Sequence, residues 1–128
     1  MIRRIEGITL GSQSAKKLED FYKKVVGLKL TFEAVMGEGK DEAEFYEFDM
    51  KGCSLYIADD RKVKGKSKNP QRFIFNLEVD NIEKEFKKIK KAGAKKIAPI
   101  HHIEGYGHVA TFADIDGNYF QLVQIRKS

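Results

Sequence analysis

The sequence has no tryptophan, a single cysteine and only two prolines in 128 residues. The one cysteine, Cys53, cannot form a disulfide within the chain, which agrees with a reducing compartment. No apolar run approaches the roughly 20 residues that a membrane-spanning helix needs, and the first residues lack the apolar stretch of a secretory signal. We therefore expect a cytoplasmic protein that folds along its whole length without a membrane segment.

The surplus of positive charge is small and dispersed. Lys and Arg number 24 against 19 Asp and Glu, which gives a net charge of +5. A basic face can bind the phosphates of a nucleic acid, but no recognisable nucleic-acid motif accompanies this charge. We interpret the excess as a solvated, lysine-rich surface and keep nucleic-acid binding as an alternative.

Two segments have the apolar spacing of an amphipathic helix. The first, residues 14–27, repeats at i, i+3, i+4, i+7 and i+8 through Leu18, Phe21, Tyr22, Val25 and Val26. The second, residues 82–92, carries Ile82, Phe86 and Ile89 on one side. Small polar residues can cap both starts, and Gly27 and Gly93 can end the two helices.

Alternating, strand-like runs surround both helices in the same order. They are residues 5–10, 28–34, 42–50 and 54–58 in the first half, and 73–79, 95–100, 108–113 and 119–125 in the second. Matching landmarks lie 67, 66 and 65 positions apart: Ile8 and Phe75, Gly27 and Gly93, Gly52 and Gly117. The sequence therefore indicates a duplicated βαβββ module.

The predicted fold class is α+β. Module one covers about residues 1–59, a polar linker about 60–70, and module two about 71–128. The chain is too short for two independent domains of ordinary size, so we expect one domain over residues 1–128. Two related, mostly antiparallel sheets with helices outside would curve toward a shared cup, the natural place for a ligand.

Strand parity assigns side chains to faces, because alternate residues point to opposite sides of a sheet. The parity predicts that Thr9 and Tyr56 of the first half face the cup. Asn76, Tyr119 and Gln121 of the second half are predicted to face it too. Glu6 falls on the helix side. The cup is therefore of mixed polarity, as small-molecule sites often are.

Two motifs resemble one known family, the vicinal oxygen chelate superfamily. Residues 18–22, Leu-Glu-Asp-Phe-Tyr, run into Val26-Gly27-Leu28, similar to the family's helix and following Gly-Leu. Residues 114–118, Asp-Ile-Asp-Gly-Asn, are similar to its Asp-Pro-Asp-Gly-Asn turn. The family includes glyoxalase I, methylmalonyl-CoA epimerase, extradiol dioxygenases, and bleomycin and fosfomycin resistance proteins. The resemblance covers nearly the whole chain and implies the tandem-module fold.

Enzymes of that family hold a divalent metal in the cup, and the resemblance implies four ligand positions here: Gly7, Tyr56, Ile74 and Gln121. Glycine and isoleucine offer no donor atom, glutamine offers a neutral amide, and a tyrosine phenol is protonated at neutral pH. Imidazole or carboxylate ligands would be required. We therefore predict no metal at these positions and no cofactor.

A stretch of histidines offers other chemistry between the second and third strands of module two. His102, Glu104 and His108 are the candidates for a displaced metal site or a general base, since imidazole titrates near neutrality. Adjacent His101 and His102 point apart if extended, and the spacing matches no established zinc pattern. Glycines on both sides of Tyr106 predict a mobile loop, in which the histidines are more simply solvent-exposed.

Three functional hypotheses follow. The first is a metal-free protein like the bleomycin-resistance type, pairing as a homodimer and binding a small molecule at Thr9, Tyr56, Asn76, Tyr119 and Gln121. The second is a lyase or isomerase like glyoxalase I or the epimerase, which would use a divalent metal or acid–base groups at His102, Glu104 and His108. The third is nucleic-acid binding through the lysine-rich surface. The identity of the ligand stays open.

Overall fold

The computed structural model describes residues 1–125, and the chain divides into two compact units, Met1–Gly65 and Lys66–Ser128. The division falls inside the predicted linker. Within the first unit, the amide of Gly65 donates to the side-chain oxygen of Gln13. Within the second unit, the amide of Ser67 donates to the carbonyl of Asp116. The linker is therefore tied to the unit on each side, and the prediction of a single domain stays a prediction.

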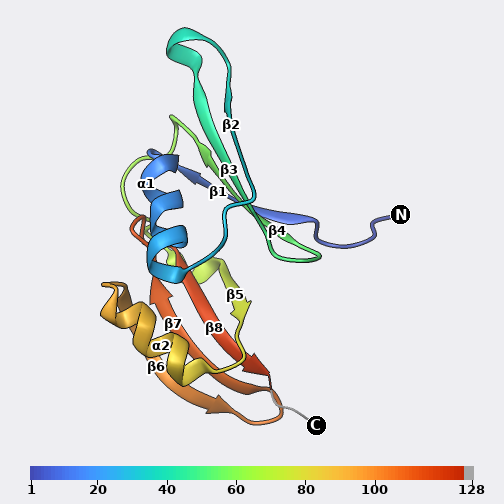
Figure 1. Ribbon diagram of the computed structural model, residues 1–128, viewed down its shortest axis with the longest axis vertical. Coiled ribbons are helices and arrows are strands. Elements are labelled where there is room, and N and C mark those ends of the chain that lie inside the picture. The colour runs from blue at the N-terminus through green and yellow to red at the C-terminus, as the bar shows by residue number, and fades with distance from the viewer. Residues whose placement is uncertain (126–128) are drawn as a thin grey trace. The chain divides into compact units, whose positions relative to one another are not determined.

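The first unit is a four-stranded sheet with one helical segment (Figure 1). Its elements are β1 (Gly7–Ser12), α1 (Ala15–Asp20), the π-helix η1 (Phe21–Val26), β2 (Phe32–Met36), the short 3-10 helix η2 (Gly39–Asp41), β3 (Ala43–Asp49) and β4 (Ser54–Asp59). The strand order is β1-β4-β3-β2. The β1–β4 pair is parallel and the other pairs are antiparallel.

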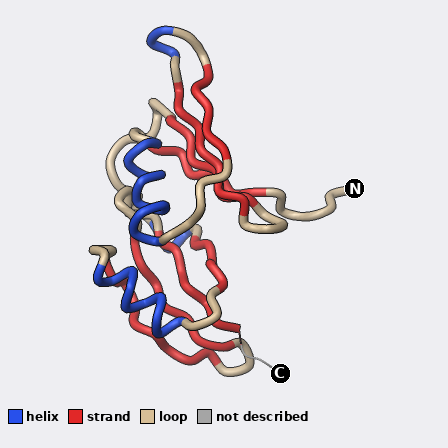
Figure 2. Tube along the Cα trace, viewed as in Figure 1, coloured by secondary structure: helices blue, strands red, loops and turns tan. Residues whose placement is uncertain are grey.

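The second unit repeats this plan (Figure 2). A 3-10 turn, η3 (Pro70–Arg72), leads into β5 (Ile74–Glu78), α2 (Ile82–Lys91), β6 (Lys95–Ile103), β7 (Gly107–Ala113) and β8 (Tyr119–Ile125). The order β5-β8-β7-β6 matches that of the first sheet, again with one parallel pair, β5–β8. The predicted α+β fold of two tandem βαβββ modules is confirmed. Among residues 1–125, no helix is both long and apolar enough to cross a membrane.

Equivalent positions of the two modules make equivalent contacts at the helix starts. Ser14 and Asn81 are the N-caps, and each side chain accepts from the amide three residues on. In each module, a side chain of the last strand accepts a hydrogen bond from the backbone amide of the first helical residue. Asp59 Oδ1 accepts from Ala15 N at 2.8 Å, and Gln124 Oε1 accepts from Ile82 N at 2.8 Å. This shared capping supports the duplication inferred from the sequence.

The first helix changes type in its middle, which the sequence did not reveal. From Phe21 to Val26 it is a π-helix, and Gly27 ends it with φ at +90°. Bonds from i to i+5 widen the turn and bring Phe21 and Val26 to one side, while the neighbouring Tyr22 is fully buried. The rings of Phe21 and Tyr22 meet edge to face at 5.3 Å. The wider turn thus lets two adjacent aromatic residues share one core.

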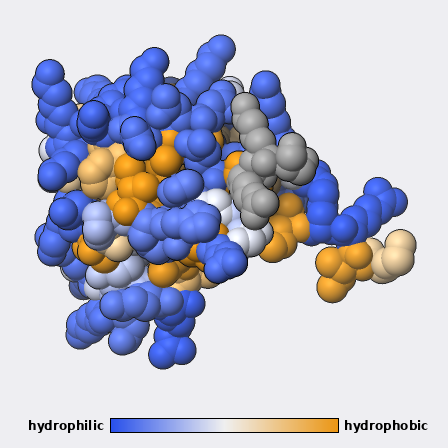
Figure 3. Space-filling view, turned by 90° about the horizontal axis from the view of Figure 1, so that it is seen from below, coloured by the Kyte–Doolittle hydropathy of each residue, from blue (hydrophilic) through white to orange (hydrophobic). Residues whose placement is uncertain are grey.

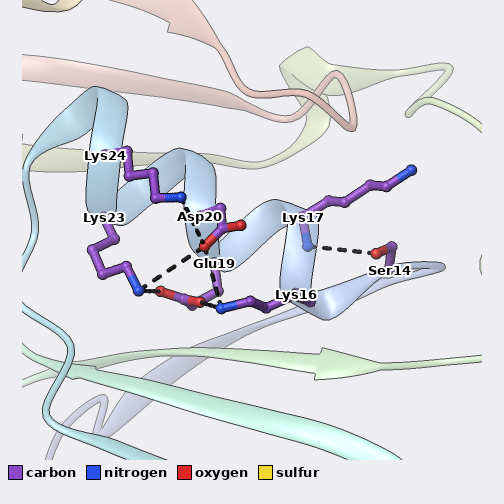
Figure 4. Close-up of polar contacts among 7 residues, drawn as sticks. All are labelled: Ser14, Lys16, Lys17, Glu19, Asp20, Lys23 and Lys24. Carbon is purple, nitrogen blue, oxygen red and sulfur yellow. Dashed lines mark hydrogen bonds and ion pairs between the residues drawn. The ribbon is translucent and has the colours of Figure 1, made fainter.

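A buried carboxylate lies on α1, between two lysines (Figure 4). The side chain of Glu19 is 0% exposed, and both Lys16 Nζ and Lys23 Nζ lie 3.1 Å from its oxygens. Hydrogen bonds to Glu19 and then Asp20 raise the pKa of Lys16 above its usual value. Lys16 also lies over the ring of Tyr46 in β3, 5.9 Å from its centre. The ion pairs therefore lie within the helical segment, and the contact of Lys16 with Tyr46 links α1 to the face of the sheet that bears this ring.

The core of each unit lies between its sheet and its helix, as strand parity predicts. In the first sheet, Tyr46, Ile57 and Leu10 are buried opposite one another across three strands. In the second, Phe112 of β7 packs against Phe86 of α2 with ring centres 5.1 Å apart, and Phe120 stacks beside it. The alternate residues of the same strands define a helix-free face in each sheet.

Candidate functional site

The helix-free face of the first sheet gathers aromatic, hydroxyl and carboxylate groups. Thr9, Tyr56 and Glu47 lie opposite one another on β1, β4 and β3. The Tyr56 ring stacks on Phe45 at 5.5 Å between centres and 29° between planes. The Ser54 hydroxyl donates to Glu47 Oε2 at 2.7 Å. This face therefore presents a flat aromatic surface bordered by hydrogen-bond acceptors.

Tyr56 is held from a second direction by Glu6. Its hydroxyl donates to the Glu6 carboxylate, and this bond is the main cause that raises the Tyr56 pKa above its usual value. Parity placed Glu6 on the helix side, and that prediction is wrong. Glu6 precedes β1, which begins at Gly7, so the alternation of the strand does not govern its direction.

Gly7 lies directly under the Tyr56 ring. A Cβ atom at position 7 would come within 2.4 Å of Tyr56 Cε2 and 3.0 Å of the Ser54 carbonyl oxygen. Real side chains do not tolerate such contacts without a shift of their neighbours. The space above Gly7, where a metal-binding side chain would start, is therefore filled by Tyr56.

The helix-free face of the second sheet carries the remaining predicted ligand residues. Asn76 lies opposite Gln121, and Ile74 lies opposite Tyr119. The Gln121 amide nitrogen donates to Thr111 Oγ1 at 3.1 Å, which orients the amide. Asn76 is exposed and Tyr119 is half-buried. The structure therefore places all three on one face, as parity predicts.

The four family ligand positions do not fit a divalent metal in this chain. The strand register around these positions is equivalent in the two modules. Gly7 lies two residues before the strand partner of Tyr56, and Ile74 lies two residues before the strand partner of Gln121. Glycine here has its side-chain space occupied by Tyr56, and the Gln121 amide is bound to Thr111. Within residues 1–125, no three or more His, Cys, Asp or Glu side chains form a group able to hold a metal. That no metal is bound stays a prediction.

His101 and His102 lie in a strand, contrary to the predicted loop, whereas His108 lies in a strand as the predicted range 108–113 has it. Strand β6 extends to Ile103, so it includes His101 and His102, while His108 belongs to β7. The turn itself is short, with the Tyr106 amide donating to the Ile103 carbonyl at 3.0 Å. The prediction placed the strand end too early, because Pro99 and the polar histidines interrupt the apolar alternation.

His102 and His108 point to the α2 side of the second sheet. They lie opposite each other, and His108 also lies opposite Gln124, which caps α2. His101 lies opposite Val109 and so points to the other face. The sheet therefore separates His102 and His108 from Asn76 and Gln121. It does not bring the predicted catalytic and ligand-binding residues together.

The first unit contains a hollow of about 530 Å³, which we considered as a second candidate ligand site. Asp59 and Asp60 line it, together with Arg61 and Lys64. Both Asp59 oxygens accept backbone amides, and Asp60 Oδ1 accepts the Lys62 amide at 2.9 Å. Because these carboxylates already have backbone partners, we favour the helix-free faces as the ligand site.

The lysine-rich surface has the solvated character that composition predicts. Lys84, Lys87, Lys88, Lys90 and Lys91 of α2 are all exposed. The face drawn in Figure 3 is covered mainly by hydrophilic side chains, with smaller apolar patches between them. Nucleic-acid binding stays an untested alternative.

Sequence reasoning missed three contributors to the first helix-free face: Glu6, Phe45 and Glu47. Phe45 was given no role on this face from the sequence. Its partnership with Tyr56 depends on the β3–β4 register, in which Glu47 lies opposite Tyr56. The length of the connecting turn, residues 50–53, sets this register, and that signal could have identified the pair.

Comparisons with known proteins agree with this architecture. A protein-family model described as the Glyoxalase/Bleomycin resistance protein/Dioxygenase superfamily matches residues 4–122. A search of curated protein sequences found no match.

Solved structures match over nearly the whole chain. TnmS3, an antibiotic binding protein from Streptomyces sp. CB03234, has a TM-score of 0.70 and 20% identity, covering 98% of each chain. The fosfomycin resistance protein FosX from Listeria monocytogenes has a TM-score of 0.75 and 17% identity, covering 98% of this chain and 96% of its own. A glyoxylase/bleomycin resistance protein/dioxygenase domain from Frankia sp. EAN1pec has a TM-score of 0.74 and 15% identity, covering 98% and 100%. At these identities the likeness establishes the fold.

Proposed function

The chain belongs to the Glyoxalase/Bleomycin resistance protein/Dioxygenase superfamily, and on that premise we propose that it binds a planar small molecule without a metal. The helix-free face of the first sheet is the proposed site. The observation that carries the proposal is the position of Tyr56. Its ring fills the space above Gly7, where members of the family have a metal-binding side chain, and the ring stacks on Phe45.

The chemistry of this face favours a ligand with an aromatic ring and a cationic or N–H-bearing group. The half-buried rings of Tyr56 and Phe45 can supply stacking worth about 0.5–1.5 kcal/mol beyond the area that it buries. Glu6 and Glu47 supply carboxylates at its border, and the exposed Thr9 supplies a hydroxyl. A cation placed against these carboxylates gains charge-assisted hydrogen bonds, which are about twice as strong as neutral ones.

The second helix-free face is proposed to bind small molecules as well, through Asn76, Tyr119 and Gln121. Thr111 binds the Gln121 amide nitrogen, so the carbonyl oxygen of that amide is oriented for a ligand donor. The similar structure of TnmS3, an antibiotic binding protein, supports small-molecule binding on this fold. No specific observation favours catalysis by His102, Glu104 and His108, because the two histidines point to the opposite face.

A screen by NMR tests the proposal. Planar aromatic amines would be added to the labelled full-length chain in EDTA, and chemical shifts recorded. We expect shifts around Thr9 and Tyr56, and at least about tenfold weaker binding in Tyr56→Ala. Tyr106→Ala is the matched control, since Tyr106 is an exposed tyrosine in the β6–β7 turn. A screen without binders, or equal losses in both variants, would refute the proposal.

We further propose that the protein is a homodimer, as the bleomycin-resistance resemblance implies, and that it acts in the cytoplasm. Light scattering on the purified chain tests the assembly. A homodimer predicts twice the chain mass of 14.6 kDa, whereas a single chain mass at micromolar concentration would contradict it.

A further inference from the structure

We propose that His102 and His108 form a two-histidine binding site for a divalent transition-metal ion such as Zn²⁺. The site is distinct from the four family positions and from the proposed ligand face. It would lie on the side of the second sheet that carries α2. Imidazole nitrogen is a preferred ligand of zinc, copper and nickel.

The strand register brings the two imidazoles together. His102 of β6 lies opposite His108 of β7 in an antiparallel pair. Side chains directly opposite each other start about 4.5–5.5 Å apart at Cβ, so both rings can reach one point. The ring centres of His102 and His108 are 5.1 Å apart, with 45° between the planes.

That separation matches the geometry of zinc. With a metal–nitrogen bond of about 2.0–2.1 Å and a ring nitrogen about 1.1 Å from its ring centre, two imidazoles on a tetrahedral ion have centres about 5.2 Å apart. Both histidine side chains are exposed, so rotation about their side-chain bonds can aim one nitrogen of each ring at the ion. The backbone need not move.

The residues around the pair show on which face of the sheet it lies and whether further protein ligands are available. Phe112 lies four residues beyond His108 on β7 and packs against α2, which fixes the face on which the pair lies. Gln124 lies opposite His108 on the neighbouring strand β8, but its side-chain oxygen already accepts a hydrogen bond from the Ile82 amide. Over residues 1–125, no third acidic, histidine or cysteine side chain joins the pair in a metal-binding group. Water would therefore complete the coordination, as it does at open zinc sites.

Calorimetric titration with Zn²⁺ tests the site. The full-length chain, without any histidine tag, would first be stripped with EDTA and dialysed. We expect one Zn²⁺ per chain, and at least about tenfold weaker binding in both His102→Ala and His108→Ala. Added Zn²⁺ should raise the melting temperature of the wild type but not that of either variant, because only the folded sheet pairs the two rings.

His101→Ala is the matched control. It removes a neighbouring exposed histidine that points to the opposite face, and its Nδ1 lies 3.0 Å from the Pro99 carbonyl oxygen. We expect this variant to bind Zn²⁺ like the wild type. Absence of zinc binding, an equal loss in His101→Ala, or retention in both pair variants would overturn the proposal. Circular dichroism confirms that each variant is folded before titration.

Discussion

Tyr56 has separate partners for its ring and for its hydroxyl. The ring covers Gly7 and stacks on Phe45, and the hydroxyl donates to Glu6. A side chain fixed at both ends loses little further freedom when a ligand stacks on it. This arrangement makes Tyr56 the residue on which the proposed binding depends most.

The contact between Gly7 and Tyr56 predicts an asymmetry between two glycines of β1. Gly7→Ala should lower the free energy of unfolding by about 1–3 kcal/mol, because the added methyl group meets the Tyr56 ring and a backbone carbonyl. Gly11→Ala should be neutral or stabilising by up to about 1 kcal/mol, since its nearest neighbours lie at 3.5 Å. Urea unfolding of both variants measures the difference.

A double variant distinguishes this contact from a general effect of strand position. In a Tyr56→Ala background, the cost of Gly7→Ala should largely disappear, because the ring that it meets is gone. A cost that stays the same in both backgrounds would contradict the contact as its cause.

Tyr46 predicts a loss of stability in alkali. Burial, followed by the nearby Glu44 carboxylate, raises the pKa of Tyr46 to about 12. In the unfolded chain a tyrosine loses its proton near pH 10, as an unperturbed phenol does. The contribution of Tyr46 is therefore complete below about pH 10 and is lost as the pH rises toward 12.

Urea unfolding between pH 9 and 11.5 checks this sign. The free energy of unfolding of the wild type should fall more steeply with pH than that of Tyr46→Phe, which has no phenol to ionise. Lys16 contributes a decline of the same sign to both proteins, since its pKa is also raised. Parallel curves for the two proteins would show that Tyr46 titrates normally.

At the scale of elements, the last strand of each module holds the start of its helix. Asp59 binds two amides, those of Ala15 and Glu44, each at 2.8 Å. Gln124 binds one, that of Ile82. Asp59→Ala should therefore cost about 2–3 kcal/mol of the free energy of unfolding, and Gln124→Ala about 1 kcal/mol. Equal costs in chemical denaturation would mean that the Asp59–Glu44 bond contributes nothing.

The buried carboxylate of α1 gives a second prediction for an element. Glu19→Gln keeps the shape of the side chain but removes the charge that pairs with Lys16 and Lys23. These lysine side chains are 53% and 37% exposed, so solvent screens the pairs and the cost should be about 1–2 kcal/mol. Asp20→Asn, at a position that is 33% exposed, should cost less. A Glu19→Gln variant as stable as the wild type in low salt would disprove this role.

Much of the fold could be predicted from the sequence because the face assignment tolerates small errors in bounds. The first strand was expected at residues 5–10 and lies at Gly7–Ser12. Moving the ends of a strand does not change which of its residues alternate, so Thr9 kept its predicted face. The second strand was expected from residue 28 but begins at Phe32. There the π-helical end binds the Leu28 amide through the Tyr22 carbonyl and delays the strand.

The site was less predictable, since its contacts depend on register. Parity placed Tyr56 and Gln121 correctly, but it could not pair Tyr56 with Phe45 or bring Glu6 to its hydroxyl. The histidines pose a further difficulty. Strand β6 contains two register shifts, between Lys96 and Ala98 and between Ala98 and His101. Each shift breaks the period of two, so the face of His102 cannot be counted from the start of the strand.

At the scale of the whole molecule, one duplicated plan supports two different helix-free faces. The first presents Tyr56 and Thr9 with nearby carboxylates, and the second presents Asn76, Tyr119 and Gln121. Neither sheet places an imidazole or carboxylate at the four positions where the family holds its metal. The two modules thus share one scaffold, while the side chains at these positions differ from the metal-binding pattern.

Metal independence of ligand binding is the central claim for the molecule. The most direct test measures the Kd of a ligand identified by the screen twice, once in EDTA and once with saturating Zn²⁺ or Mn²⁺. We predict the same Kd within about twofold, because Gly7, Tyr56, Ile74 and Gln121 offer a metal no imidazole or carboxylate ligand. Binding that is lost in EDTA, or that strengthens more than about tenfold with either metal, would contradict the account.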